Sequence, residues 1–223
     1  MSERTVVKSV AKICTSIDLL RHGETVGGAV FRGSIDDNLT ENGWSQMATA
    51  VSQQPQQWER IISSPLRRCA DFAHKLGQQH TLPVSLEPRF KEMHFGDWEG
   101  RSAAELMTTD EEALTRFWND PVQCTPPAAE LLLDFERRVL SAWADLLRDY
   151  LGEKILLVTH GGVIRVLLCH LQQRPIKQLL EIEVKHAALK QLRIDHTEGP
   201  RLIENITATD TAVNRKTMLD SPA

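Results

Sequence analysis

The chain has 223 residues, of which 41% are hydrophobic and 25% charged, and its formal net charge at pH 7 is −4. This composition is typical of one soluble globular domain, and the net acidity argues against nucleic acid or an anionic membrane as the partner. No segment approaches the roughly 20 apolar residues that span a bilayer, and the N-terminus has no apolar signal-peptide core, so we expect a cytoplasmic protein. Cys14, Cys69, Cys124 and Cys169 form no CxxC pair and are expected to be reduced thiols.

Short apolar runs alternate with helical patterns along the chain, which predicts an α/β fold with a mostly parallel central sheet and helices on both faces. Buried strands are expected at residues 15–20, 59–63 and 154–159. Helices are expected from Thr40 to about Gln54, from Glu130 to Leu151 and from Gly161 to about Leu171. A further helix is expected from Pro65 to Leu76, with Ser64 as its cap and Gly77 as its end, and another from the capping box Ser102–Glu105 towards Phe117. Closing strands are expected at 187–195 and 201–206.

The segment 97–150 is rich in helical patterns and punctuated by prolines, which predicts a small helical side lobe over one edge of the sheet. We therefore expect a single domain over residues 1–206 with this lobe inserted. Residues 207–223 show little apolar periodicity and are expected to form a flexible C-terminal tail. No sequence feature indicates an oligomeric state.

Basic side chains follow each of three predicted strands. Arg21-His22-Gly23 follows the first, Arg67-Arg68 follows the second, and His160-Gly161-Gly162 follows the third. Ligands of open α/β sheets bind beyond the carboxyl ends of the strands, and the helix that begins at Gly161 directs N–H groups to the same place. Arg21, His22, an arginine of the pair Arg67-Arg68 and His160 are therefore expected to form a positive cup of phosphate size, called the phosphate cup below. In such a cup arginines clamp phosphate oxygens and a neutral imidazole attacks phosphorus.

A fourth segment, Phe90–Gly100, contains glycines and aromatic residues that indicate a structured loop rather than a helix. A carboxyl group held in this loop could donate a proton to a leaving oxygen and later accept one from water. For Glu92, one of the loop's carboxylates, the competing interpretation is a solvated loop carboxylate. His94 is interpreted as a structural aromatic residue, and no paired histidine spacing predicts a metal site.

Together these motifs resemble those of the histidine phosphatase superfamily, which has the phosphoglycerate mutase-like fold. The resemblance implies that His22 is transiently phosphorylated, with Glu92 as proton donor and later base. It also implies that no metal or cofactor is needed, and that Arg32 reaches the substrate. Arg21, Arg68, His160 and the N–H of Gly161 would hold the phosphoryl group. The matching pieces are Arg21-His22-Gly23-Glu24-Thr25, Arg32-Gly33 with Leu39-Thr40-Glu41-Asn42-Gly43, Ser63-Ser64-Pro65-Leu66-Arg67-Arg68, Glu92 with Phe95-Gly96-Asp97-Trp98-Glu99-Gly100, and Thr159-His160-Gly161-Gly162.

Within the family, the chain resembles phosphatases more than mutases. Mutases usually carry a larger insertion between the positions of Glu92 and His160, and they tend to have Trp-Asn where this chain has Gly27-Gly28. Val26–Gly28 and the loop around Glu92 are most similar to the α-ribazole phosphatase branch, which implies α-ribazole 5′-phosphate, a precursor of the cobalamin lower ligand, as the small phosphorylated metabolite. A phosphoglycerate mutase, a broad sugar-phosphate phosphatase and a non-catalytic phosphate-binding scaffold remain as alternatives.

One segment departs from the family pattern. Pro126-Pro127-Ala128-Ala129-Glu130-Leu131 stands where relatives have Pro-x-Gly-Gly-Glu-Ser. Because alanine adopts positive φ only at a cost, we expect a reshaped loop here. Leu131 lacks the hydroxyl that could cap the following helix. The departure of residues 126–131 from the family pattern bears on substrate specificity more than on hydrolysis.

Overall fold

The computed structural model describes residues 13–53, 58–196 and 201–205, so the predicted tail at 207–223 lies outside the described residues. The strands are β1 Cys14–Arg21, β2 Arg60–Ser63, β3 Val84–Leu86, β4 Lys154–Thr159, β5 Leu189–Asp195 and β6 Arg201–Asn205, and the α-helices are α1 Glu41–Ser52, α2 Arg67–His80, α3 Ala103–Thr109, α4 Glu111–Asn119, α5 Leu132–Asp149 and α6 Gly161–Leu171. No helix in this described part of the chain is both long and apolar enough to cross a membrane.

The strands form one six-stranded sheet in the order β3-β2-β4-β1-β5-β6. Strands β1 to β4 pair in parallel, whereas β5 runs antiparallel to β1 and β6 antiparallel to β5. The predicted α/β fold with a mostly parallel sheet is therefore confirmed. The register pairs Arg21 of β1 with Thr159 of β4, and Ser63 of β2 with Val158. The three strand ends that carry the basic motifs are thus adjacent at one edge of the sheet.

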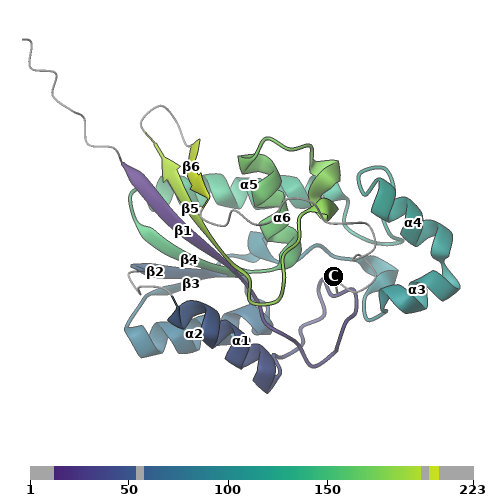
Figure 1. Cartoon of the computed structure of the whole chain (residues 1–223), viewed down its shortest axis with the longest axis horizontal. Helices are drawn as coiled ribbons and strands as arrows, with labels where there is room; N and C mark the ends of the chain where they lie inside the picture. The colour runs from purple at the N-terminus through teal and green to yellow at the C-terminus, as the bar shows by residue number, and fades with distance from the viewer. Residues whose placement is uncertain (1–12, 54–57, 197–200, 206–223) are drawn as a thin grey trace, which may run out of the picture.

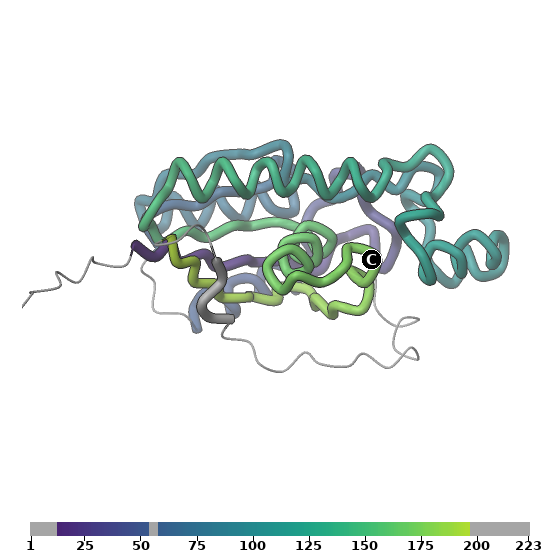
Figure 2. Tube along the Cα trace, turned by 90° about the horizontal axis from the view of Figure 1, so that it is seen from above, coloured from purple at the N-terminus to yellow at the C-terminus, as the bar shows by residue number. Residues whose placement is uncertain are grey.

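Helices cover both faces of the sheet (Figure 1). Side chains alternate along each strand, so Ile155 and Leu157 of β4 pack with α5 and α6, while Leu156 and Val158 pack with α1 and α2. Each of these four side chains is 0% exposed. Helix α5 runs along the molecule in Figure 2, and its apolar stripe covers its face of the sheet. This two-sided burial fixes the strand register and therefore the positions of the strand ends.

Helix α2 differs from its predicted bounds at both ends. Its expected cap, Ser64, instead contacts His160 and accepts a hydrogen bond from the Leu66 N–H, and the helix begins at Arg67, whose N–H donates to Asp36 at 2.6 Å. The predicted end at Gly77 is also wrong, because the helix continues to His80. A Cβ on Gly77 would lie 2.4 Å from a methyl group of Val84, so this glycine permits close packing of α2 on β3 rather than ending the helix.

The side lobe is smaller than predicted. The capping box of Ser102 and Glu105 is present, but the helix that it begins ends at Thr109, and a second helix follows Asp110. These two short helices, α3 and α4, project beyond the sheet in both views and share a separate apolar cluster (Figures 1 and 2). Helix α5, predicted within the lobe, belongs to the main core instead. The assignment of residues 1–206 to one domain stays a prediction.

In the loop before α5, Ala128 has a φ of 57°, in the left-handed region that favours glycine, and the reshaping of this loop relative to the family stays a prediction. The loop is fixed by its packing on Gly96, where a Cβ would lie 2.0 Å from the carbonyl oxygen of Pro127. That same carbonyl accepts a hydrogen bond from the Asp97 N–H at 2.9 Å. Helix α5 begins at Leu132, and as expected Leu131 at the N-cap position provides no side-chain cap.

Candidate active site

The three strand ends bring Arg21, His22, Arg68 and His160 together. The His22 N–H donates to the Thr159 carbonyl at 3.0 Å, which ties the end of β1 to the end of β4. The rings of His22 and His160 lie 5.4 Å apart between centroids, and all four side chains of the phosphate cup are at most 5% exposed. Charged groups are buried this deeply only where a partner or a function requires them.

His22 is held in the form that a nucleophile needs. Its Nδ1 lies 2.8 Å from the Gly23 carbonyl oxygen, and because a carbonyl can only accept, Nδ1 carries the proton and Nε2 carries the lone pair. Burial, followed by the charges of Arg21 and Arg68, lowers the pKa of His22 well below its usual value. His22 is therefore neutral at physiological pH, with Nε2 available to attack an electrophile.

His160 is oriented by two contacts. Nε of Arg68 donates to His160 Nδ1 at 3.3 Å, so the proton of the neutral ring lies on Nε2, which contacts Ser64 Oγ at 2.7 Å. Burial and then Arg68 lower the pKa of His160 well below its usual value. The adjacent Cys69 is a thiol rather than a thiolate, since burial raises its pKa to about 12.

The two arginines of the phosphate cup are oriented by backbone carbonyls. Arg21 donates to Val184 at 2.6 Å, and Arg68 donates to Ile35 at 2.6 Å and to Gly33 at 3.0 Å. Burial, followed by the charge of Arg165, lowers the pKa of Arg21 to about 9, so Arg21 remains charged at neutral pH. These carbonyl oxygens orient the two guanidinium groups, and a carbonyl does not itself cancel a positive charge.

Glu92 projects into the same region from the loop that follows β3. Its Oε1 accepts the Met93 N–H and its Oε2 accepts the Gly162 N–H, each at 2.9 Å, and the residue is 9% exposed. The alternative of a solvated loop carboxylate is therefore wrong. Arg138 fixes the backbone of the loop, because Nη2 donates to the Glu92 carbonyl at 2.9 Å while the guanidinium pairs with Glu130. These contacts define where a proton could be delivered.

Arg32 is buried beside the phosphate cup. Its Nε donates to Asp37 at 2.8 Å and its Nη2 to the Gly28 carbonyl at 3.0 Å. These bonds hold the loop between β1 and α1 together, and the contact of Arg32 with substrate stays a prediction. Gly161, also predicted to bind phosphate, is the first residue of α6 and directly follows His160.

Sequence reasoning missed His186 and Arg165. The His186 ring lies 5.8 Å from that of His22, and burial followed by Arg21 lowers its pKa to about 4. His186 precedes β5, which is antiparallel to β1, so the beginning of β5 lies at the same edge as the end of β1. The feature that places His186 near His22 is the antiparallel direction of β5, and the apolar pattern of a strand does not reveal its direction. Arg165 lies one turn into α6, where helical periodicity places it above Gly161.

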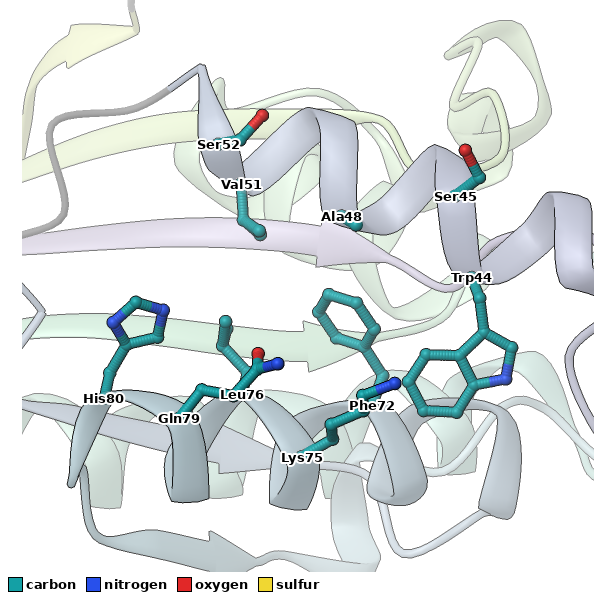
Figure 3. Close-up of a pocket in the computed structure, with 10 residues that line it drawn as sticks. All are labelled: Trp44, Ser45, Ala48, Val51, Ser52, Phe72, Lys75, Leu76, Gln79 and His80. Atoms are coloured by element: carbon teal, nitrogen blue, oxygen red, sulfur yellow. The ribbon is translucent and has the colours of Figure 1, made fainter.

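Among the described residues, no three His, Cys, Asp or Glu side chains form a cluster suited to a metal ion. A cleft of about 360 Å³ lies between α1 and α2, away from the strand ends (Figure 3). The rings of Trp44 and Phe72 lie 5.6 Å apart there, and Lys75 lies over the Trp44 ring. This cleft contains none of the predicted site residues, so the chemistry is assigned to the strand ends.

Comparison with known proteins agrees with this geometry. The chain is 32% identical over 169 residues to a glucosyl-3-phosphoglycerate phosphatase of Mycobacterium tuberculosis, covering 71% of this chain and 75% of the relative. It is 29% identical over 192 residues to the adenosylcobalamin/alpha-ribazole phosphatase of Salmonella typhimurium, covering 81% and 90%. The solved structure of Bacillus stearothermophilus YhfR superposes with a TM-score of 0.77 at 26% identity, covering 89% of this chain and 98% of that one. A family model, histidine phosphatase superfamily (branch 1), matches residues 17–205, and the chain therefore belongs to this superfamily.

Proposed function

We propose that the chain hydrolyses small phosphate monoesters without a metal ion, through a phosphohistidine at His22. The observation that carries this proposal is the contact of His22 Nδ1 with the Gly23 carbonyl, which leaves Nε2 unprotonated in a side chain buried with Arg21, Arg68 and His160. The family and the named relatives are phosphatases, so the proposal adds the residues and the intermediate to an activity class already supported by similarity.

The first half-reaction would transfer the phosphoryl group to the enzyme. Nε2 of His22 attacks phosphorus, the bond from phosphorus to the ester oxygen breaks, and Glu92 gives a proton to that oxygen. Arg21, Arg68 and His160 bind the phosphoryl oxygens as charge moves between them, with the Gly161 N–H as a further donor. In the second half-reaction water attacks phosphorus, Glu92 takes a proton from the water, and the bond from phosphorus to nitrogen breaks.

The relatives offer two leaving groups. α-Ribazole 5′-phosphate carries a nucleoside-like alcohol without a carboxylate, whereas glucosyl-3-phosphoglycerate carries a carboxylate near the phosphoester. Similarity alone does not rank them, since the chain resembles enzymes named for both. We therefore propose a small phosphorylated metabolite as the substrate, with α-ribazole 5′-phosphate and glucosyl-3-phosphoglycerate as the first two compounds to test.

The test is hydrolysis of p-nitrophenyl phosphate in the presence of EDTA, with the protein quenched in base and analysed by mass spectrometry for a phosphate on His22. We expect turnover and a phosphorylated peptide, both lost in His22→Ala by at least about 10³-fold. His74→Ala, at an exposed position of α2, is the matched control and keeps full activity. No turnover, or turnover only after addition of magnesium, would contradict the proposal. Transfer between phosphoglycerates without net release would indicate a mutase.

A further inference from the structure

Arg165 is a third arginine of the site with no assigned role. It lies on α6 one turn after Gly161, and helical side chains lean towards the N-terminus of their helix. A Cβ added to Gly161 would lie 3.4 Å from Nε of Arg21 and 3.5 Å from Nη1 of Arg165. The two guanidinium groups therefore lie close to one point beside Gly161, within reach of one small ligand.

The Arg165 guanidinium is oriented but not neutralised. Its Nε donates to the Ile182 carbonyl at 2.9 Å. In the part of the chain that the structure describes, no carboxylate pairs with Arg165, and neither Nη1 nor Nη2 makes a hydrogen bond. The neighbouring Glu183 is 3.7 Å from Lys185 instead. Arg138, whose role is structural, has the opposite pattern, since Glu130 and three carbonyls take up its donors. The half-buried Arg165 guanidinium is therefore without an anionic hydrogen-bond partner among the described residues.

Arg165 lies on the side of the site where the leaving group departs. Burial lowers the pKa of Arg165, and the charge of Glu92, the proposed proton donor to the leaving oxygen, opposes this shift. Glu92 also bonds to Gly162, the residue next to the one that Arg21 and Arg165 flank. An in-line displacement places the leaving oxygen opposite the attacking His22. An anionic group attached a few bonds from that oxygen would therefore meet Arg165.

We propose that Arg165 binds a carboxylate on the leaving group, so that the preferred substrates are phosphate monoesters with a carboxylate a few bonds from the ester oxygen. This inference rests on the proposed function and deepens it, because it favours a phosphoglycerate-type leaving group over a nucleoside-like one. A guanidinium binds a carboxylate through two parallel hydrogen bonds, whereas a neutral hydroxyl in its place leaves the buried charge without a partner.

The experiment compares two substrates that differ only in this group. 3-Phosphoglycerate carries a carboxylate where glycerol 3-phosphate carries a hydroxymethyl group, and kcat/KM is measured for each. We expect the wild-type protein to favour 3-phosphoglycerate by roughly tenfold or more, the size of one charge-assisted contact. Arg165→Gln should bring this ratio close to one, and Arg165→Lys should keep part of it. Arg137→Gln, at an exposed position of α5, is the control and keeps both the ratio and the activity.

The ratio separates binding from a structural role. If Arg165 serves only to hold the loop at Ile182, Arg165→Gln slows both substrates alike and preserves the ratio, which would overturn the inference. A wild-type protein that does not distinguish the two substrates, or that turns over α-ribazole 5′-phosphate faster than 3-phosphoglycerate, would also overturn it. Hydrolysis of p-nitrophenyl phosphate separates these results from failure of the proposed function. If only the role of Arg165 is wrong, the wild-type protein still hydrolyses p-nitrophenyl phosphate, whereas if the proposed function is wrong, it does not.

Discussion

Gly162→Ala is expected to displace the proposed proton donor while leaving the phosphate cup in place. A Cβ at this position would lie 2.2 Å from Oε1 and 3.1 Å from the carboxyl carbon of Glu92. The N–H that bonds to Oε2 belongs to the same residue, so the carboxyl group cannot both keep this bond and avoid the methyl group. It has to move away from the position that its two backbone contacts define.

The size of the effect follows from this distance. A carbon and an oxygen that are not bonded need more than 3 Å, so the Glu92 carboxyl group has to shift by roughly 1 Å, and a misplacement of that order can cost about 10²-fold in rate. General acid catalysis contributes about 10²- to 10⁴-fold, so a loss near 10² in kcat corresponds to a partly disabled acid. The fold itself should suffer little, because the preference of a helix for alanine over glycine, about 1 kcal/mol, opposes the cost of a tight contact of 3.3 Å with the ring of Phe135.

The assay compares leaving groups. An alkyl phosphate needs a proton on its leaving oxygen, whereas p-nitrophenolate departs without one, so Gly162→Ala should slow the alkyl phosphate far more. Gly161→Ala provides the comparison, since its methyl group would lie at ordinary contact distances of 3.4 Å and 3.5 Å from two arginine side chains. We expect Gly161→Ala, whose methyl group would lie beside the phosphate-binding arginines, to slow both leaving groups alike. Equal losses on both leaving groups in Gly162→Ala would refute the placement of Glu92 as the acid.

Three further predictions concern protonation, strain and loop support. Burial and nearby arginines hold the pKa values of His22 and His160 well below 6.5 in the folded state, so the unfolded chain binds more protons below that pH. As the pH is lowered below about 6.5, the free energy of unfolding should therefore decrease, by up to about 1.4 kcal/mol per pH unit for each histidine. A free energy of unfolding from urea denaturation that is the same at pH 7.5 and pH 5.5 would contradict this. Ala128→Gly should stabilise the fold by about 0.5–1 kcal/mol, because release of positive-φ strain exceeds the added freedom of the unfolded chain; an unchanged urea midpoint would count against it. Arg138→Met should destabilise the fold by about 2 kcal/mol, and it should lower kcat on alkyl phosphates because the hydrogen bond to the Glu92 carbonyl is lost. An unchanged kcat would show that Arg138 does not position Glu92.

The sequence alone was enough to predict the phosphate cup because its determinants are local. Each basic motif follows an apolar strand, and parallel pairing of β1, β2 and β4 necessarily brings their carboxyl ends to one edge. The capping of α1 by Thr40 was equally predictable, since its hydroxyl accepts the Gly43 N–H as the residue pattern suggested. In these cases neighbours in the sequence supply the whole physical reason.

The features that sequence reasoning missed depend on contacts between distant segments. Asp36 replaces Ser64 as the partner of the first N–H of α2, although α1 and β2 lie between Asp36 and α2 in the chain. Gly77 stays inside α2 because β3 packs against it, and Ala128 keeps a positive φ because Gly96 leaves room for the loop. A glycine or serine pattern is the same whether the residue ends a helix or permits a close approach, so only the tertiary structure separates the two.

The arginines of this protein divide by the partner that holds them, and this division explains why the site can bind an anion. Arg60, Arg32 and Arg138 pair with the carboxylates of Glu153, Asp37 and Glu130, so their charge is already compensated. Arg68 and Arg165 donate instead to the carbonyls of Ile35 and Ile182, and Arg21 also donates to a carbonyl, that of Val184. A carbonyl orients a guanidinium without cancelling its charge, so an anion that binds Arg68 or Arg165 need not displace a carboxylate of the described residues. The loops at residues 32–35 and 182–187 thus act as supports that keep the positive charge directed at the strand ends.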